Sequence, residues 1–138
     1  MTIINYDQRL VKSKNPYPKG PNDWKRFFSF NTDAKVIGIQ YIVTALFFLL
    51  LGGLLGMLVR GELITPPSDL FDPTVYNGLY TMHGTVMLFL FLFPMLSGLT
   101  NLLVPPMIGA PDMAFPKLNA LAFWLVPVFS IILLLSFF

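Results

Sequence analysis

Three long apolar runs without a charged residue constrain the fold of this chain more than any other feature. They cover residues 36–59, about 79–104 and 118–138. The first contains twenty-four residues, enough to cross a hydrocarbon core of about 30 Å at about 1.5 Å per helical residue. Together with a hydrophobic content of 55%, the runs predict an all-α membrane protein whose three transmembrane helices form part of a larger helical bundle.

Polar segments separate these runs and indicate their orientation. Seven of the nine lysine and arginine residues lie in the N-terminal segment 1–35, one opens the loop 60–78 and one closes the loop 105–117. Because basic residues gather on the cytoplasmic side of membranes, we expect segments 1–35 and 105–117 inside and segment 60–78 outside. The third run reaches residue 138 without polar anchors, so we expect a longer protein or other chains that complete it.

His83 is the only histidine of the chain, which contains no cysteine. The absence of cysteine excludes disulfides, iron–sulfur clusters and thiolate zinc sites. His83 lies near the outer end of the second run, where a polar group needs a partner because hydrocarbon offers none. One imidazole cannot complete a zinc or copper site, so heme ligation fits best; a hydrogen bond to a neighbouring helix is the alternative.

Small residues and one arginine mark the outer half of the first run. Gly52, Gly53 and Gly56 form a face, with Gly52 and Gly56 in GxxxG spacing, where a second helix or a flat cofactor can approach closely. Arg60 follows at roughly the expected depth of His83. Its guanidinium could donate to a heme carboxylate, or it could simply terminate the span.

The predicted inner side carries one carboxylate and two amides of interest. Asp112 lies in an apolar loop, where it could collect protons or cap a helix. Asn101 and Asn119 lie at the inner ends of the second and third runs. They could hold a water chain that leads from Asp112 into the membrane, or they could be ordinary helix-end amides.

Several strings in this order resemble one family. They are residues 32–38 (TDAKVIG), 60–63 (RGEL), 76–77 (YN), 82–85 (MHGT) and, above all, 103–119 (LVPPMIGAPDMAFPKLN). The chain from about Trp24 to Phe138 resembles the N-terminal quarter of subunit I of the heme-copper oxidases, of the cytochrome c oxidase type. The strings are long and in the family's order, so the resemblance is specific.

The resemblance implies a heme site on the outer side. His83 matches the first axial ligand of the low-spin heme, expected to be a-type, and Arg60 matches the arginine beside that heme. We expect Tyr76, Gly52 and Gly56 to bind the heme together with His83 and Arg60. Glu62 matches a position associated in some members with an outer cation site.

On the inner side, the resemblance implies a proton pathway. Asp112 matches the carboxylate at the entrance of the D-pathway, and Asn101 and Asn119 match asparagines that line it. One position departs from the family, because Ala34 stands where members usually have histidine. The expected consequence is the loss of a local interaction on the inner side, and no cofactor ligand is affected.

The resemblance also implies what this segment needs from elsewhere. The second axial histidine and the ligands of a high-spin heme and copper belong to later helices, so the 138 residues alone should not reduce oxygen. The expected enzyme is a proton-translocating oxidoreductase of the respiratory chain in a bacterial plasma membrane or mitochondrial inner membrane. The expected partners are the remainder of subunit I or a companion chain, subunits II and III, cytochrome c as electron donor, and lipid, without nucleic acid.

Two other functions remain open from the sequence. One is a short paralogue that serves as a non-catalytic structural subunit of a membrane complex. The other is a small electron-transfer cytochrome in which two copies each give one His83 to a shared heme, since bis-histidine ligation needs two imidazoles.

Overall fold

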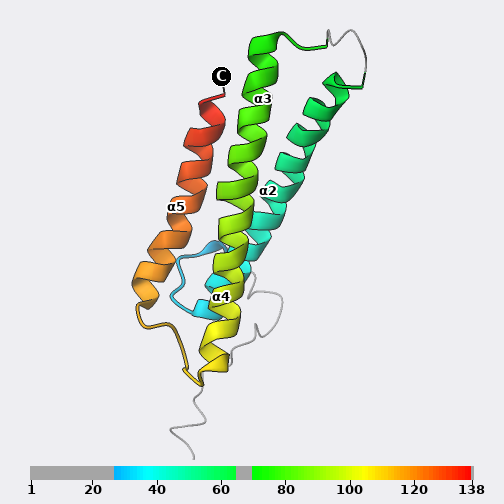
Figure 1. Cartoon of the computed structure of the whole chain (residues 1–138). Helices are drawn as coiled ribbons and strands as arrows, with labels where there is room; N and C mark the ends of the chain where they lie inside the picture. The colour runs from blue at the N-terminus through cyan, green and yellow to red at the C-terminus, as the bar shows by residue number, and fades with distance from the viewer. Residues whose placement is uncertain (1–26, 65–69, 138) are drawn as a thin grey trace, which may run out of the picture.

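A computed structural model describes residues 27–64 and 70–137 of the chain, and these residues form helices and no strand. Figure 1 shows three long rods that run side by side, with the C-terminal end of the chain beside the start of the middle rod. The elements in chain order are α2 (Ala34–Glu62), α3 (Pro73–Thr85), the π-helix η2 (Val86–Leu92), α4 (Phe93–Met107) and α5 (Pro116–Leu135).

The middle rod is one continuous helical span, Pro73–Met107, built from α3, η2 and α4. All three spans, Ala34–Glu62, Pro73–Met107 and Pro116–Leu135, are long and apolar enough to cross a membrane. The predicted all-α fold class with three membrane-spanning helices is therefore confirmed. Where the membrane boundaries and segment limits fall along these helices remains a prediction, and segment 1–35 lies mostly outside the described residues.

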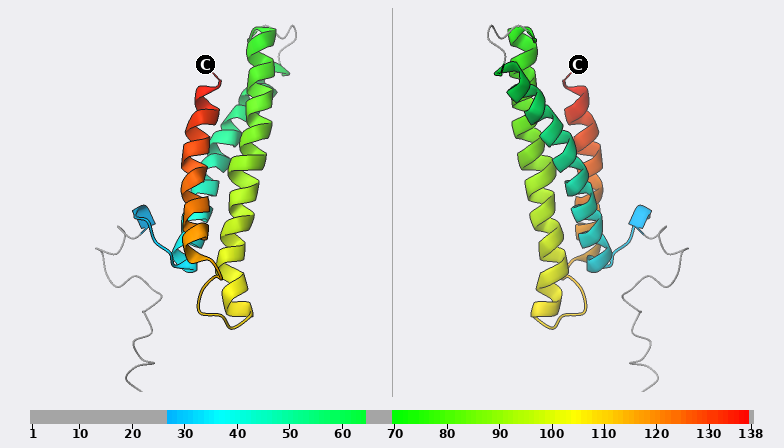
Figure 2. Two further views of the ribbon diagram at one scale, coloured as in Figure 1. Left: turned by 90° about the vertical axis from the view of Figure 1, so that its left-hand side faces the viewer. Right: turned by 90° about the vertical axis from the view of Figure 1, so that its right-hand side faces the viewer.

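Two ends of the bundle can be distinguished. At one end lie the start of α2, the end of α4 and the start of α5; at the other lie the end of α2 and the start of α3 (Figure 2). We call the first the inner end and the second the outer end, after the predicted orientation. Residues 27–33 lie near the inner end, so every element predicted to face inside and described by the structure meets there.

Local sequence explains where the helices begin and end. Asp33 caps α2, since its side chain accepts the Lys35 N–H at 3.0 Å, and Asp72 caps α3 with Pro73 in the first turn. Pro105 and Pro106 were expected to lie in a loop, but α4 continues through both to Met107. Each proline removes one backbone N–H bond, to the carbonyl of Asn101 or Leu102, and the helix ends one residue after the second proline.

Two helices approach each other closely near the inner end. A Cβ on Gly38 would meet the Gly98 carbonyl oxygen at 3.0 Å, and one on Gly98 would meet the Gly38 oxygen at 2.9 Å. Only glycine permits two helical backbones to approach this closely. α5 packs on the same region of α2 through Ile37, Tyr41, Ala120 and Phe123, so all three spans meet at the inner end.

Candidate functional site

The His83 imidazole is held against α2 by two glycines. Its Nδ1 lies 2.8 Å from the carbonyl oxygen of Gly52. A Cβ on Gly56 would meet ring atoms Cε1 at 2.9 Å and Nδ1 at 3.1 Å, so the missing side chain is what admits the ring. A carbonyl oxygen can only accept, so Nδ1 carries the proton and Nε2 carries the lone pair.

Both glycines face side chains of the middle span. Gly52 offers its carbonyl to the ring, and a Cβ there would meet the Met87 sulfur at 2.7 Å. Gly56 gives the ring its space, while Gly53 has nothing within 4 Å of its Cβ position. Nε2 of His83 has no hydrogen-bond partner among the described residues. The arrangement fixes one ring nitrogen and leaves the other available as a ligand.

Arg60 and Tyr76 lie further toward the outer end than the ring. Arg60 is exposed and follows Gly56 by four residues, about 6 Å along the helix axis. Tyr76 is half-buried and precedes His83 by seven residues, which places it on the same face about 10 Å further out. His83 itself lies ten residues into the span Pro73–Met107. The ring is therefore about one turn deeper than Arg60, and not at the same depth as expected.

Glu62 is buried and tied to the backbone of the outer loop. It is 4% exposed, and its Oε2 accepts the N–H of Phe71 at 3.1 Å. No group of three histidine, aspartate or glutamate side chains able to hold a metal ion occurs within residues 27–64 and 70–137. The contact fixes the end of α2 to the start of α3, and the cation-site role of Glu62 remains a prediction.

Asp112 links the loop between α4 and α5 to the first residue of α2. Its Oδ1 accepts the N–H of Ala34 at 3.1 Å and that of Met113 at 2.8 Å, while Oδ2 has no partner among the described residues. Ala34 is 2% exposed. Ala34, where the resemblance led us to expect histidine, thus contacts the candidate carboxylate through its backbone.

The two predicted amides meet between the middle and third spans. Asn119 Nδ2 donates to Asn101 Oδ1 at 2.7 Å, and Asn101 Nδ2 donates to the Ser97 carbonyl oxygen at 3.0 Å. Asn101 is 3% exposed. The structure thus joins these two residues to each other, and it gives neither of them a direct hydrogen bond to Asp112.

Gln40 is a buried polar residue that the sequence analysis missed. Its Nε2 donates to the carbonyl oxygens of Phe27 at 2.7 Å and Ser29 at 3.5 Å, and its Oε1 is buried without a partner among the described residues. Gln40 therefore holds the segment before α2 against that helix. A glutamine in an uncharged membrane run was the available signal, because such a polar group needs a partner.

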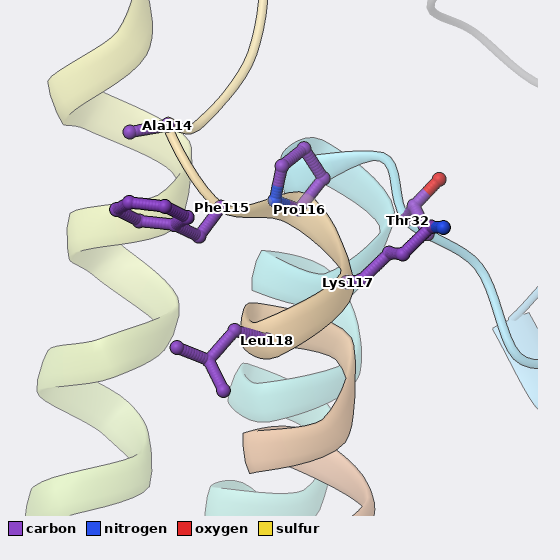
Figure 3. A pocket seen from close by; sticks show the side chains of 6 residues that line it. All are labelled: Thr32, Ala114, Phe115, Pro116, Lys117 and Leu118. Atoms are coloured by element: carbon purple, nitrogen blue, oxygen red, sulfur yellow. The ribbon is translucent and has the colours of Figure 1, made fainter.

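A hollow of about 450 Å³ lies beside the start of α5. Figure 3 shows that the Phe115 and Leu118 side chains point toward α4, while the Lys117 side chain extends toward Thr32. None of the residues predicted from the sequence to form a functional site lines this hollow. The lining residues are Thr32, Ala114, Phe115, Pro116, Lys117 and Leu118.

The three apolar spans define this chain as an integral membrane protein of the all-helical class. Residues 36–138 match the family "Cytochrome C and Quinol oxidase polypeptide I". The chain belongs to this family and corresponds to the N-terminal part of subunit I. The predicted resemblance is therefore confirmed over most of the chain.

Curated relatives agree with the family. Cytochrome c oxidase subunit 1 of Thermostichus vulcanus is 55% identical over 123 residues, covering 87% of this chain and 22% of the relative. That of Synechocystis sp. is 50% identical over 115 residues, covering 83% and 21%. That of Corynebacterium efficiens is 44% identical over 119 residues, covering 86% and 20%. The chain thus spans about a fifth of the length of these relatives.

Proposed function

We propose that this chain forms the N-terminal segment of a terminal oxidase subunit I. In this function the segment supplies one axial ligand of the low-spin heme and the entrance of the D-pathway for protons. The complete complex reduces oxygen with electrons from cytochrome c and couples that reaction to proton pumping. Family membership supports an oxidoreductase complex, and the contacts of His83 support the ligand role most directly.

The hydrogen bond between His83 Nδ1 and the Gly52 carbonyl is the observation that carries the proposal. Metal-bound histidines usually donate their second ring N–H to a carbonyl or carboxylate, which fixes the tautomer and the ring orientation. The bond of 2.8 Å does this here, and it leaves Nε2 with its lone pair. A histidine that only joined two helices would not require the other nitrogen to remain free.

The surroundings of the ring also fit a flat apolar group. Gly56 presents no side chain near His83, and Arg60 and Tyr76 lie on its outer side with groups that can donate hydrogen bonds. We assign these residues, with Gly52, to the binding of a low-spin heme of a-type. When bound, the heme supplies one-electron chemistry at its iron.

On the inner side, Asp112 is proposed to take up protons from the aqueous phase. Its Oδ1 is engaged by two backbone N–H groups, so the side chain is held in place while Oδ2 can gain and lose a proton. The Asn101–Asn119 pair provides amide groups further along, between two helices. Water between Asp112 and this pair would complete the path, because neither amide contacts the carboxylate directly.

The rest of the activity is assigned to parts of the protein beyond these residues. We propose that the second axial ligand, a high-spin heme and copper are held by the remainder of subunit I or a companion chain. Subunits II and III are the proposed partners, in a bacterial plasma membrane with the N-terminal segment on the cytoplasmic side. The basic residues before the first span support this orientation.

Replacing the proposed ligand tests this function. In the purified complex, His83→Ala should abolish the low-spin heme band in a reduced-minus-oxidised spectrum, since no other histidine exists in the chain to replace it. Thr81→Ala is the matched control, because its hydroxyl bonds only to the Asn77 carbonyl of its own helix. An assembled His83→Ala complex that keeps the band unchanged would refute the ligand role.

A further inference from the structure

Two contacts join α2 to the middle span, and they are one residue further apart along the middle span than along α2. On α2, Gly38 and Gly56 are the first and last of the glycines that receive side chains from the middle span, and they are eighteen residues apart. Their partners are Leu102, whose Cγ lies 2.8 Å from the Cβ position of Gly38, and His83, whose Cε1 lies 2.9 Å from that of Gly56. These partners are nineteen residues apart.

Eighteen residues make five complete turns of an α-helix at 3.6 residues per turn. Gly38 and Gly56 of α2 (Ala34–Glu62) therefore lie on one face of that helix. Nineteen residues of α-helix would leave His83 and Leu102 about 100° apart around the axis. Both nevertheless face α2, so the middle span must contain one residue more than its α-helical turns account for.

The π-helix η2 (Val86–Leu92) lies between the two contacts and accounts for the extra residue. Its i→i+5 hydrogen bonds add one residue to a turn, and the Phe93 N–H bonds to the Leu88 carbonyl in this pattern. Pro94 directly follows. It has no N–H for the Leu90 carbonyl, so the α-helical pattern is already interrupted at this point.

The added residue decides which helix Asn101 faces. In an unbroken α-helix, residue 101 would follow His83 by five complete turns and would point at Gly38 in place of Leu102. With the π-helix, Leu102 takes that position and Asn101 is turned by about 100° from it. Asn101 instead bonds to Asn119 of α5 at 2.7 Å.

We propose that η2 is a register element that orients His83 toward α2 and Asn101 toward α5 within a single helix. The functional meaning of this orientation rests on the proposed function, in which His83 binds heme and Asn101 belongs to the proton path. The register itself follows from the contacts. In this proposal the residues of η2 position His83 and Asn101, and they need not contact a cofactor or belong to a proton path themselves.

Deleting one residue from η2 tests the proposal. Loss of Leu88, which is 50% exposed, should convert η2 to α-helix and leave His83 and Leu102 eighteen residues apart. Both contacts with α2 would then be kept, and the low-spin heme band should be retained. Deletion of Leu50, 72% exposed on α2, is the matched control. It turns Gly56 by about 100° relative to Gly38 with no π-helix to absorb the change, so the band should be lost.

A cross-link reports the inner contact independently of heme. The chain has no cysteine, so Asn101→Cys with Asn119→Cys introduces a single thiol pair that a short bifunctional reagent should join, as measured by intact mass. The pair should still be joined after deletion of Leu88. Loss of this cross-link, or equal heme loss or equal retention in the two deletions, would overturn the register proposal. A preserved cross-link in a complex whose heme is indifferent to His83→Ala would instead overturn the proposed function alone.

Discussion

The outer and inner halves of the bundle hold their polar groups in different ways. In the outer half, the His83 ring is fixed by a backbone carbonyl and by the absence of a side chain at Gly56. In the inner half, Asp112, Asn101 and Asn119 bond across elements through their own side chains. The His83 site leaves a ring nitrogen without a partner among the described residues, whereas Asp112, Asn101 and Asn119 join separate elements of the chain.

His83 can bind a ligand without losing its contact to α2, whereas Asp112 has both a structural contact and a proposed function. His83 contributes one bond to the packing of the helices and keeps Nε2 for a ligand. Asp112, the proposed proton-entry carboxylate, also ties the α4–α5 loop to the start of α2, so its replacement can affect structure as well as the proposed proton uptake. A useful variant on the inner side must keep the hydrogen bonds and change only the titratable group.

The largest effect is expected from filling the space beside His83. Gly56→Leu should displace the ring, break its bond to Gly52 and abolish the low-spin heme band, because a Cβ alone would lie 2.9 Å from the ring. Gly53→Leu adds the same volume where nothing lies within 4 Å and should leave the band intact. Equal spectra for the two variants would show that the ring is not bound where the glycines hold it.

A second, smaller effect is expected from Asp112→Asn. The amide oxygen can still accept from Ala34 and Met113, so the loop should stay in place and heme content should be normal. Turnover should fall by about a hundredfold, the lower end of what a positioned proton-transfer group contributes, and proton pumping should fall with it. Oxygen consumption and proton release of the complex in vesicles measure both.

Asp33→Asn is the control for this variant. Asp33 is also an inner-end aspartate, and its carboxylate accepts the Lys35 N–H as the cap of α2. We expect this substitution to leave turnover nearly unchanged. Full pumping in Asp112→Asn, or the same loss in Asp33→Asn, would mean that Asp112 acts only as a cap and that protons enter elsewhere.

The sequence predicted the parts of the fold that depend on composition along the chain. Uncharged runs located all three spans, because length and hydropathy alone decide whether a helix can cross a membrane. The sequence also showed the glycine face of the first span. It did not show whether the space at Gly56 is filled by ordinary helix packing or by the His83 ring. The use of this space by His83 depends on the depth at which the middle span packs, and that helix begins at Pro73, before the predicted start near Leu79.

What the sequence could not show depends on matching one helix to another. The π-helix is needed to align the contacts of the middle span with those of α2, and this alignment cannot be read from the sequence. Pro94 alone indicates only that the helix is interrupted. The bond from Ala34 to Asp112 uses a backbone N–H, which every residue except proline has and which therefore leaves no sequence signal. The depth of Arg60 relative to His83 was misjudged for the same reason, since it was counted from span ends and not from contacts.

A moderate effect is expected from Arg60→Met in the outer half. Removing a cation beside the proposed heme should lower the reduction potential of the heme. The effect should be smaller than that of ligand loss, since the iron stays ligated by His83. The change should be on the order of tens of millivolts, as for a unit charge roughly 10 Å away at an effective dielectric constant of about 20. Arg60→Lys keeps the charge and should reduce the shift. An unaltered potential and visible spectrum would leave Arg60 as a residue that terminates the helix.

The smallest effect is expected where the inner half joins its helices. In Asn119→Ala, the Asn101 oxygen loses its donor while remaining buried, so the helices should separate more easily. A double-mutant cycle of Asn101→Ala and Asn119→Ala should give a coupling free energy of about 0.6 kcal/mol, the average for hydrogen bonds between membrane helices. Reversible unfolding of the chain in mixed micelles measures it.

A cycle between Thr100→Ala and Asn119→Ala is the control, because the Thr100 hydroxyl bonds to the Leu96 carbonyl of its own helix. That pair should show no coupling. If the asparagine pair also shows none, its hydrogen bond contributes nothing to joining α4 and α5. The two amides would then be free to reorient toward water, and the inner half would resemble the outer half in keeping its polar groups available for function.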